Sequence, residues 1–108
     1  MSRKVSIVIP CYNDFKYIER AVNSARSQTY PNKEIIVIDD GSNSKTKELL
    51  INLKPHIDNL ITQENMGVVA SRNTAISQAK GDYILTLDSD DYFQPDFLKK
   101  AVSILDLN

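Results

Sequence analysis

Two short runs of acidic residues each follow an apolar segment of this chain. Asp39-Asp40-Gly41-Ser42 comes after Ile35–Ile38, and Asp88-Ser89-Asp90-Asp91 comes after Tyr83–Leu87. Because an unpaired carboxylate is costly to bury, acidic clusters at the ends of apolar strands need a partner. Mg²⁺ and Mn²⁺ take oxygen ligands, often one or two carboxylates together with substrate phosphates. The two runs therefore predict a divalent cation that holds a phosphorylated ligand.

Asp88 and Asp90 form an Asp-x-Asp pair at the end of the last strand-like segment. Helix capping or a solvated turn would also explain such a pair when it is taken alone. A calcium-binding EF-hand loop is excluded, because its sixth position would be Phe93 and its twelfth Lys99. A metal that bridges two phosphates would stabilise the charge on a departing nucleoside diphosphate.

The Asp39-Asp40-Gly41-Ser42 run is expected to form a strand-to-helix turn. Gly41 can supply a positive φ, and one carboxylate together with Ser42 can cap the turn. The other carboxylate can accept a hydrogen bond from a base edge, such as a uracil imide. The residue pattern leaves open which acid has which role.

Arg72 is a third candidate. It has helical spacing from Val69 and Ile76, on the expected buried stripe of its helix, where most arginines extend to solvent or pair with an acid. It also falls in the first turn of that helix, which Asn65-Met66-Gly67 precedes as a turn. A guanidinium there suits contact with a phosphate or stacking on a base.

Strand-like and helix-like segments alternate along the chain. Strands are expected at residues 5–10, 35–38, 57–61 and 83–87. Helical apolar stripes are formed by Ile18, Ala21, Val22 and Ala25, by Leu49, Leu50 and Leu53, within residues 68–79, and by Leu98, Ala101, Val102 and Leu105. This β-α alternation predicts an α/β fold, with an open, parallel, Rossmann-like sheet and helices on both faces.

Four helix ends have expected capping or boundary residues: Asn13 or Asp14, Ser42 or Ser44, Gly81, and Pro95. The asparagine, aspartate and serine residues have side chains that can cap helix N-termini. Gly81 is expected to end the third helix and Pro95 to be the first residue of the last one.

The strand order determines where a ligand would bind. If the order is 3-2-1-4, strands two and four flank strand one and lie about 10 Å apart. Ligands of such sheets bind at the carboxyl ends of the strands, where the strand order reverses. Both acidic runs would then face one crevice, with residues 10–13 between them. That separation suits a nucleoside at one end and its diphosphate at the other.

Composition limits the class of protein. The chain has 108 residues, 42% of them apolar, and a net charge of −1. These values are typical of one soluble globular domain, and they provide no basic surface for nucleic acid. The single cysteine excludes an internal disulfide framework, and no apolar stretch suits a signal peptide or a membrane span. We expect a cytoplasmic protein, with association at the inner face of the membrane left open.

Other reactive residue types are expected to be structural. His56 lies in a polar loop, and Lys47 belongs to a helix face expected to be solvated. Cys11 has no second cysteine, and the only histidine is distant in sequence, so a thiol nucleophile is not expected. Tyr92 and Phe93 are expected to pack in the core or to form a wall on the sugar side.

Five segments together resemble the inverting GT-A glycosyltransferases of the family-2 type. They are Val8–Asn13, Ser27–Tyr30, Val37–Ser42, Asn65-x-Gly67 with Arg72-Asn73, and Leu87–Asp91. The resemblance covers essentially the whole chain, in order and with family-like spacing. It implies a Rossmann-like, donor-binding part spanning residues 1–108 and a sugar-nucleotide donor, by family habit a UDP-sugar.

The resemblance also implies a role for each matching position. Pro10, Tyr12 and Asn13 would lie along the nucleoside, and Asp40 would bind the base. Arg72 would lie near the base or the phosphates, Asp88 near the ribose or the metal, and Asp90 would ligate Mn²⁺ or Mg²⁺. These roles imply metal-dependent transfer of a sugar to an acceptor hydroxyl with inversion, in bacterial surface polysaccharide or glycolipid synthesis. The acceptor would be a saccharide or a lipid-linked molecule.

One departure from the family pattern concerns the general base. In the family the acceptor-binding half follows the Asp-x-Asp strand and supplies a carboxylate base, whereas this sequence ends at Asn108. The acids that follow the Asp88–Asp91 run are Asp96 and Asp106, both expected in a helix. The catalytic base is therefore expected beyond Asn108. We expect a truncated, donor-binding fragment with little turnover of its own and with exposed apolar surface that favours self-association.

Three other functions were weighed. A receiver-type signalling domain would carry its acid pair after the first strand, where Pro10-Cys11 stands. A dinucleotide-binding protein would need Gly-x-Gly-x-x-Gly there, and the glycines of this chain are 41, 67 and 81. A catalytically incompetent nucleotide-binding fragment, or a non-enzymatic module of the same fold, stays open as an alternative.

Overall fold

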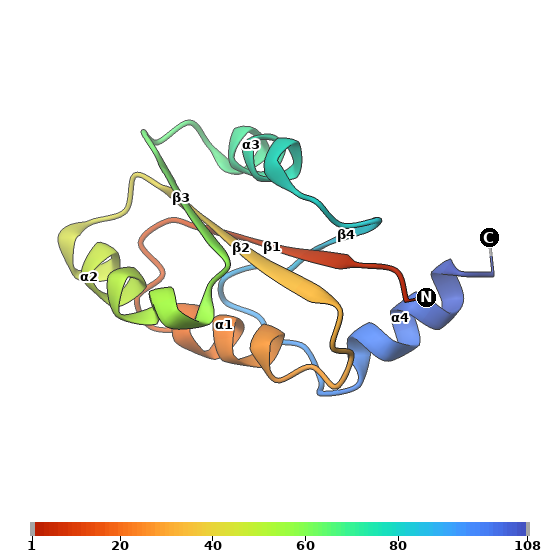
Figure 1. The fold of residues 1–108 in the computed structure, drawn as a ribbon. Helices are drawn as coiled ribbons and strands as arrows, with labels where there is room; N and C mark the ends of the chain where they lie inside the picture. The colour runs from red at the N-terminus through yellow and green to blue at the C-terminus, as the bar shows by residue number, and fades with distance from the viewer. Residues whose placement is uncertain (1, 108) are drawn as a thin grey trace.

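The structure is a computed structural model that describes residues 2–107. Its strands are β1 (Val5–Cys11), β2 (Lys33–Asp40), β3 (Asn59–Gln63) and β4 (Tyr83–Thr86). Its helices are α1 (Ile18–Arg26), α2 (Ser44–Leu53), the short 3₁₀ helix η1 (Lys54–His56), α3 (Val68–Gln78) and α4 (Phe97–Leu105). The predicted alternation of strands and helices is confirmed (Figure 1).

The four strands form one parallel sheet, as predicted, in the order β3-β2-β1-β4, which is the order that brings both acidic runs to one crevice. Val5 at the start of β1 pairs with Lys33 on one side and with Tyr83 on the other. β1 and β2 are central and buried on both faces, because helices cover both sides of the sheet. β3 is an edge strand, as expected, although it begins two residues later than the predicted segment at 57.

Two apolar clusters lie on opposite faces of the sheet. On one face, α1, α2 and α4 pack against β1 and β2 through residues that include Ile18, Leu50 and Leu98. On the other face, α3 contributes Ala75 to a smaller cluster with Val8 and the buried isoleucines of β2. Figure 1 shows α3 on one side of the sheet and α1 and α2 on the other. The expected arrangement of helices on both faces is confirmed.

The packing face of α3 differs from the predicted apolar stripe. Ser71 and Ala75 are buried against the sheet, whereas Val69 is 67% exposed and Ile76 41% exposed. Small side chains let the helix lie close to the sheet, so the large apolar residues turn outward. Several large apolar side chains are therefore exposed around α3 and β4: Met66, Val68, Val69, Ile76 and Ile84.

The N-cap predictions for α1 and α2 are wrong. Helix α1 begins after Tyr17, which makes no side-chain cap. Helix α2 is capped by Asn43, whose Oδ1 accepts a hydrogen bond from the Thr46 amide at 3.0 Å. Ser42 instead accepts from the backbone of Asn13, so the residues expected to be caps connect two loops.

Gly81 and Pro95 also have roles other than those predicted. Helix α3 ends at Gln78, and its C-cap residue Ala79 is extended. Gly81 approaches β1 so closely that an added Cβ would lie 2.5 Å from Ser6 Oγ. Close backbone approach, and not a helix cap, requires glycine there. Helix α4 begins at Phe97, after Asp96, so Pro95 precedes the helix.

Gln28 links the end of α1 to the start of α4. Its buried amide donates to the carbonyls of Ser24, at 3.0 Å, and Gln94, at 2.7 Å, and its Oε1 accepts from the Leu98 amide at 2.9 Å. These bonds satisfy a polar side chain in the core and determine where α4 begins. No helix within residues 2–107 is long and apolar enough to cross a membrane.

Candidate functional site

A cleft of about 340 Å³ lies at the carboxyl ends of β1, β2 and β4. Pro10 and Tyr12 line it between Asp40 on one side and Asp88 and Asp90 on the other. The strand order thus brings both acidic runs to one crevice, as the sequence predicted. Among the predicted site residues, Asn13 and Arg72 lie next to this cleft without lining it.

Asp40 is held from the loop between β3 and α3. Its Oδ1 accepts from Gln63 Nε2 at 2.9 Å and from the Met66 amide at 2.8 Å, and its Oδ2 accepts from the Gly67 amide at 2.9 Å. A carboxylate offers about four acceptor positions, so at most one remains for a ligand. A base contact at Asp40 would therefore be a single hydrogen bond.

The pKa of Asp40 is lowered by this environment. Burial alone would raise the pKa, but the hydrogen bonds from Gln63 and from the amides of Met66 and Gly67 outweigh it. Asp40 is therefore ionised at neutral pH although it is only 4% exposed. An ionised carboxylate can accept a hydrogen bond from an N–H group of a base, but it cannot donate a hydrogen bond to the base.

Asp39 is the acid that caps the turn. Its Oδ1 accepts from the Ser42 amide at 2.9 Å, and its Oδ2 pairs with Lys47 Nζ at 2.7 Å. Burial would raise its pKa, but these partners lower it. Lys47, expected on a solvated helix face, has a side chain that is 41% exposed, and its ammonium in addition compensates the buried charge of Asp39.

Asn13 joins the loop after β1 to the turn after β2. Its backbone has a φ of 55°, a left-handed conformation that asparagine adopts more readily than most residues. Its amide donates to Ser42 Oγ at 3.0 Å, and its Oδ1 accepts from the Asn43 amide at 2.7 Å. Both polar groups are thus used in holding Tyr12 and Asp40 on one rim of the cleft.

Arg72 reaches the opposite rim. Its Nη2 lies 3.1 Å from Asp88 Oδ1, with the two side chains 39% and 61% exposed. An exposed pair of this kind contributes about 0–1 kcal/mol, so a phosphate can displace it at little cost. Arg72 Nε is buried and has no hydrogen-bond partner in the described part of the chain. The guanidinium is thus available to an anionic group.

Asp14 is a cleft residue that the sequence analysis considered only as a helix cap. It lines the cleft, and its Oδ2 accepts a hydrogen bond from Ser89 Oγ at 2.7 Å. The pairing joins the segment after β1 to the Asp-x-Asp turn. Nothing in the local sequence signals it, because the two residues are 75 positions apart.

Cys11 is among the residues that line the cleft, but it is buried. Burial raises the pKa of its thiol to about 11, so the thiolate that a nucleophile requires is scarce at neutral pH. This agrees with the expectation that Cys11 is structural. His56, in η1, contacts Arg26 on the side of α1 away from the cleft.

The acids of the cleft fit a hard divalent cation that is also bound by phosphates. Four carboxylates line it: Asp14, Asp40, Asp88 and Asp90. In the part of the chain that the structure describes, no three acidic, histidine or cysteine side chains come together as a complete metal site. Magnesium-type ions need only one or two protein carboxylates when substrate phosphates supply the other ligands.

The fold and the cleft define a class of protein, an open parallel α/β domain with acidic residues at the carboxyl ends of its strands. The family model "Glycosyl transferase family 2" matches residues 6–108. The chain belongs to this family. The resemblance recognised in the sequence is thereby confirmed.

Known relatives agree with this assignment. The chain is 43% identical over 95 residues to the chondroitin synthase of Pasteurella multocida, covering 85% of this chain and 10% of that protein. The structure resembles S. aureus TarS in complex with UDP-GlcNAc, with a TM-score of 0.86 and 33% identity, covering 96% of this chain and 31% of the other. It also resembles a mannosyltransferase from Pyrobaculum calidifontis in complex with GDP-Man and Mn²⁺, with a TM-score of 0.89 and 26% identity, covering 97% and 33%.

The relatives are longer than this chain. It spans 42% of an uncharacterised glycosyltransferase from Haemophilus influenzae, to which it is 38% identical. The two solved structures match the fold over 96% and 97% of this chain. The comparisons therefore establish the family and the GT-A type of fold.

Proposed function

We propose that this chain is the donor-binding part of a metal-dependent, inverting glycosyltransferase that uses a nucleoside-diphosphate sugar. The observation that carries the proposal is the single cleft shared by Pro10, Tyr12, Asp40 and the Asp88–Asp90 pair. Related structures contain UDP-GlcNAc, or GDP-Man with Mn²⁺, which supports a donor of this class. UDP is the preferred nucleotide. The wider role is bacterial surface polysaccharide or glycolipid synthesis, which the chondroitin synthase relative supports.

In this proposal the two rims of the cleft hold the two ends of the donor. Pro10 and Tyr12 lie along the nucleoside, with Asp40 accepting one hydrogen bond from the base. Asp88 and Asp90 hold Mn²⁺ or Mg²⁺ beside the diphosphate, and Arg72 exchanges its weak pairing with Asp88 for a phosphate oxygen. A bound divalent cation would supply Lewis acidity toward the leaving nucleoside diphosphate.

The charge of the cleft supports the requirement for a cation. Four carboxylates line the crevice, whereas its nearby guanidinium already pairs with Asp88. A diphosphate entering alone would meet like charge, and a divalent cation reverses that local field. Donor binding should therefore depend strongly on metal.

The base that would deprotonate the acceptor hydroxyl is proposed to lie outside residues 1–108. Asp96 pairs with Lys100 at 3.1 Å, and Asp106 accepts from the Tyr83 hydroxyl at 2.5 Å. Neither acid lines the cleft. The longer relatives provide room for an acceptor-binding half, for a saccharide or lipid-linked acceptor, which we place in the part of such proteins that this chain does not span.

The test is a calorimetric titration of the chain with UDP, in Mn²⁺ and in chelator. We expect binding in Mn²⁺ and at least tenfold weaker binding in chelator, because the metal offsets the acidic cleft. Asp90→Ala should remove the metal-dependent gain while the circular dichroism spectrum and the melting temperature stay unchanged. Unaltered affinity of that variant in Mn²⁺ would contradict the assignment of Asp90 as a ligand.

A non-enzymatic nucleotide-binding module of the same fold is the second candidate. The placement of Asp96 and Asp106 away from the cleft is the observation that favours it. Release of UDP from a UDP-sugar by the longer protein, in the presence of an acceptor, would decide in favour of the transferase. Binding without any such release would favour the module.

A further inference from the structure

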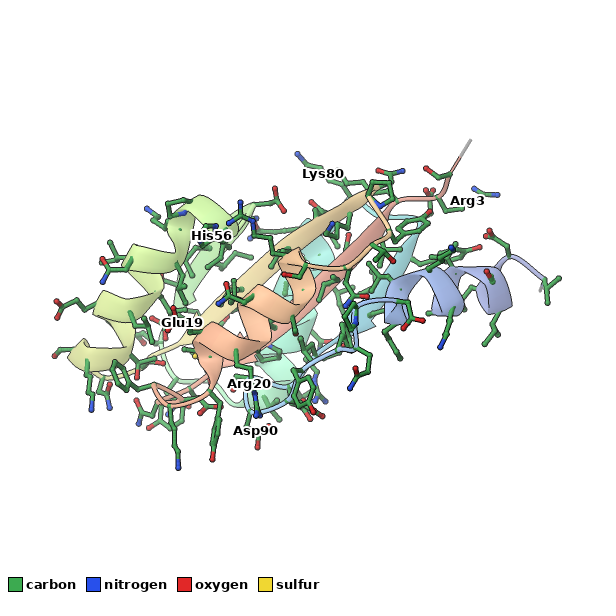
Figure 2. All side chains as sticks on the ribbon, turned by 90° about the horizontal axis from the view of Figure 1, so that it is seen from below. Arg3, Glu19, Arg20, His56, Lys80 and Asp90 are labelled. Atoms are coloured by element: carbon green, nitrogen blue, oxygen red, sulfur yellow. The ribbon has the colours of Figure 1, made fainter. Side chains whose placement is uncertain are left out.

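The turn that carries the expected metal ligands, Asp88–Tyr92, is held by α1. Its internal hydrogen bonds are short-range, from the Asp91 amide to the Asp88 carbonyl and from the Tyr92 amide to the Asp91 carboxylate, both at 2.9 Å. Outside the turn, Asp14 accepts a hydrogen bond from Ser89 Oγ at 2.7 Å. From α1, Arg20 Nη2 donates to the backbone carbonyl of Asp90 at 3.0 Å. Figure 2 shows Arg20 and Asp90 next to each other at one edge of the molecule.

Two aromatic rings hold the Arg20 guanidinium in place. Its Cζ lies 4.7 Å from the ring centroid of Tyr92, in the turn, and 5.0 Å from that of Tyr17, just before α1. Both distances are within the range of cation–π attraction. The guanidinium thus joins the start of α1 to both the backbone and a side chain of the turn.

The contact uses the carbonyl of Asp90 and leaves its carboxylate free. Among the described residues, the Asp90 carboxylate takes part in no hydrogen bond or ion pair, whereas that of Asp88 pairs with Arg72. A cation bonded to the carboxylate itself would compete with a metal ion. A cation bonded to the backbone fixes the residue without occupying the ligand atoms.

We propose that Arg20 is a positioning residue that holds the Asp88–Tyr92 turn so that the Asp90 carboxylate faces the cleft. The effect of Arg20 on metal-dependent donor binding rests on the proposed function. Lysine cannot replace arginine fully here, because an ammonium lacks the planar fork that donates to a carbonyl while stacking on rings. The role requires this geometry, and charge alone does not supply it.

The test compares Arg20→Gln and Arg20→Lys with a matched control, Arg26→Gln. Arg26 lies on the same helix, and its guanidinium contacts His56, away from the cleft. UDP is titrated calorimetrically in Mn²⁺ and in chelator, and hydrogen exchange of the 91–93 amides is followed without ligand. Loss of a group that orients a metal ligand typically costs 10–100-fold in metal affinity.

We expect Arg20→Gln to weaken UDP binding in Mn²⁺ by about tenfold and to leave binding in chelator within about twofold. Exchange of the 91–93 amides should be faster in Arg20→Gln, only partly restored in Arg20→Lys, and unchanged in Arg26→Gln. Equal weakening with and without Mn²⁺, or unchanged affinity in Mn²⁺, would overturn the inference.

The two proposals can fail separately. If the unmodified chain shows no Mn²⁺-dependent binding of UDP, the proposed function fails in this chain. The exchange measurement then still decides the role of Arg20. Faster exchange confined to the turn in Arg20→Gln would support the positioning role, and identical exchange in all variants would overturn it.

Discussion

The two acidic corners of the cleft are built in opposite ways. Asp40 is 4% exposed and accepts three hydrogen bonds, from Gln63 at the end of β3 and from two amides of the loop before α3, whereas Asp90 is exposed and its carboxylate has no partner among the described residues. Asp40 is the last residue of the central strand β2, and Asp90 follows the edge strand β4. One carboxylate is therefore part of the folded framework, and the other is free to take a ligand.

This difference separates stability from function. A buried carboxylate that accepts three internal hydrogen bonds fixes the backbone around it, so replacing it should first affect folding. An exposed carboxylate costs little to keep or remove, so replacing it should first affect ligand binding. Substitutions at the two corners can therefore test whether the division holds.

The largest expected effect on stability is that of Asp40→Asn. An asparagine presents an NH₂ group to one of the backbone donors, so we expect the free energy of unfolding to fall by about 3 kcal/mol. Urea denaturation measures it. Asp90→Asn is the matched control and should change stability by less than about 0.5 kcal/mol. Equal losses in both variants would contradict the distinction between the two corners.

A side chain added at Gly41, in the turn after Asp40, should destabilise the protein more than one added at Gly67, in the loop that donates to Asp40. Gly41 has a φ of 77°, and an added Cβ would lie 2.8 Å from the Asn65 amide nitrogen. Gly67 has a φ of 93°, but an added Cβ there would meet nothing within 4 Å. We expect Gly41→Ala to cost about 2 kcal/mol and Gly67→Ala about 1 kcal/mol, since only the first adds a backbone clash to the strain.

Both glycine variants are compared by thermal and urea unfolding. A cost for Gly67→Ala as large as that for Gly41→Ala would mean that backbone strain, and not the contact with Asn65, limits this corner. A negligible cost for Gly41→Ala would show that the loop after β3 moves to make room. Either result would alter the picture of a rigid Asp40 corner.

The smallest expected effect is the dependence of stability on acid. Burial raises the pKa values of Asp39 and Asp40, but the hydrogen bonds that they accept lower the pKa values by more. The net result is a pKa below the ordinary value of 3.8 for both groups. A lowered carboxyl pKa adds stability that is complete above the unfolded pKa and is lost as the pH falls through the folded one. Urea midpoints should therefore decrease as the pH falls below about 4.

Asp40→Asn is the variant that sharpens the acid measurement. It removes one of the carboxyl groups whose pKa is lowered, so its stability should fall less steeply with acid than that of the unmodified chain. An identical slope in both proteins would show that Asp40 does not contribute to the acid dependence.

The parallel arrangement of strands was predictable from the sequence because local patterns carry it. The strand at 35–38 is apolar at every position and requires cover on both faces, and the β-α alternation then favours a parallel sheet. The helix caps were not predictable in the same way. Asn43 and Ser42 are both competent N-cap residues, and only the position of the loop after β1 assigns Ser42 to Asn13.

The packing of α3 shows the same limit. Its sequence contains large apolar residues at helical spacing, and the predicted buried stripe used them. The structure buries Ser71 and Ala75, because the distance between helix and sheet admits only small side chains. Periodicity identifies an apolar face, but the space available between layers decides which face is used.

By itself the sequence determined the family, the parallel α/β class of fold and the placing of both acidic runs at strand ends, because these follow from patterns along the chain. Only the tertiary structure decided the strand order and how fully each acid is already bonded. Asp40 is bound by residues 23 to 27 positions away, and Asp90 is held through its backbone by Arg20, 70 residues away. Contacts between residues so distant in sequence leave no local pattern, because they arise only when the sheet brings the loops together.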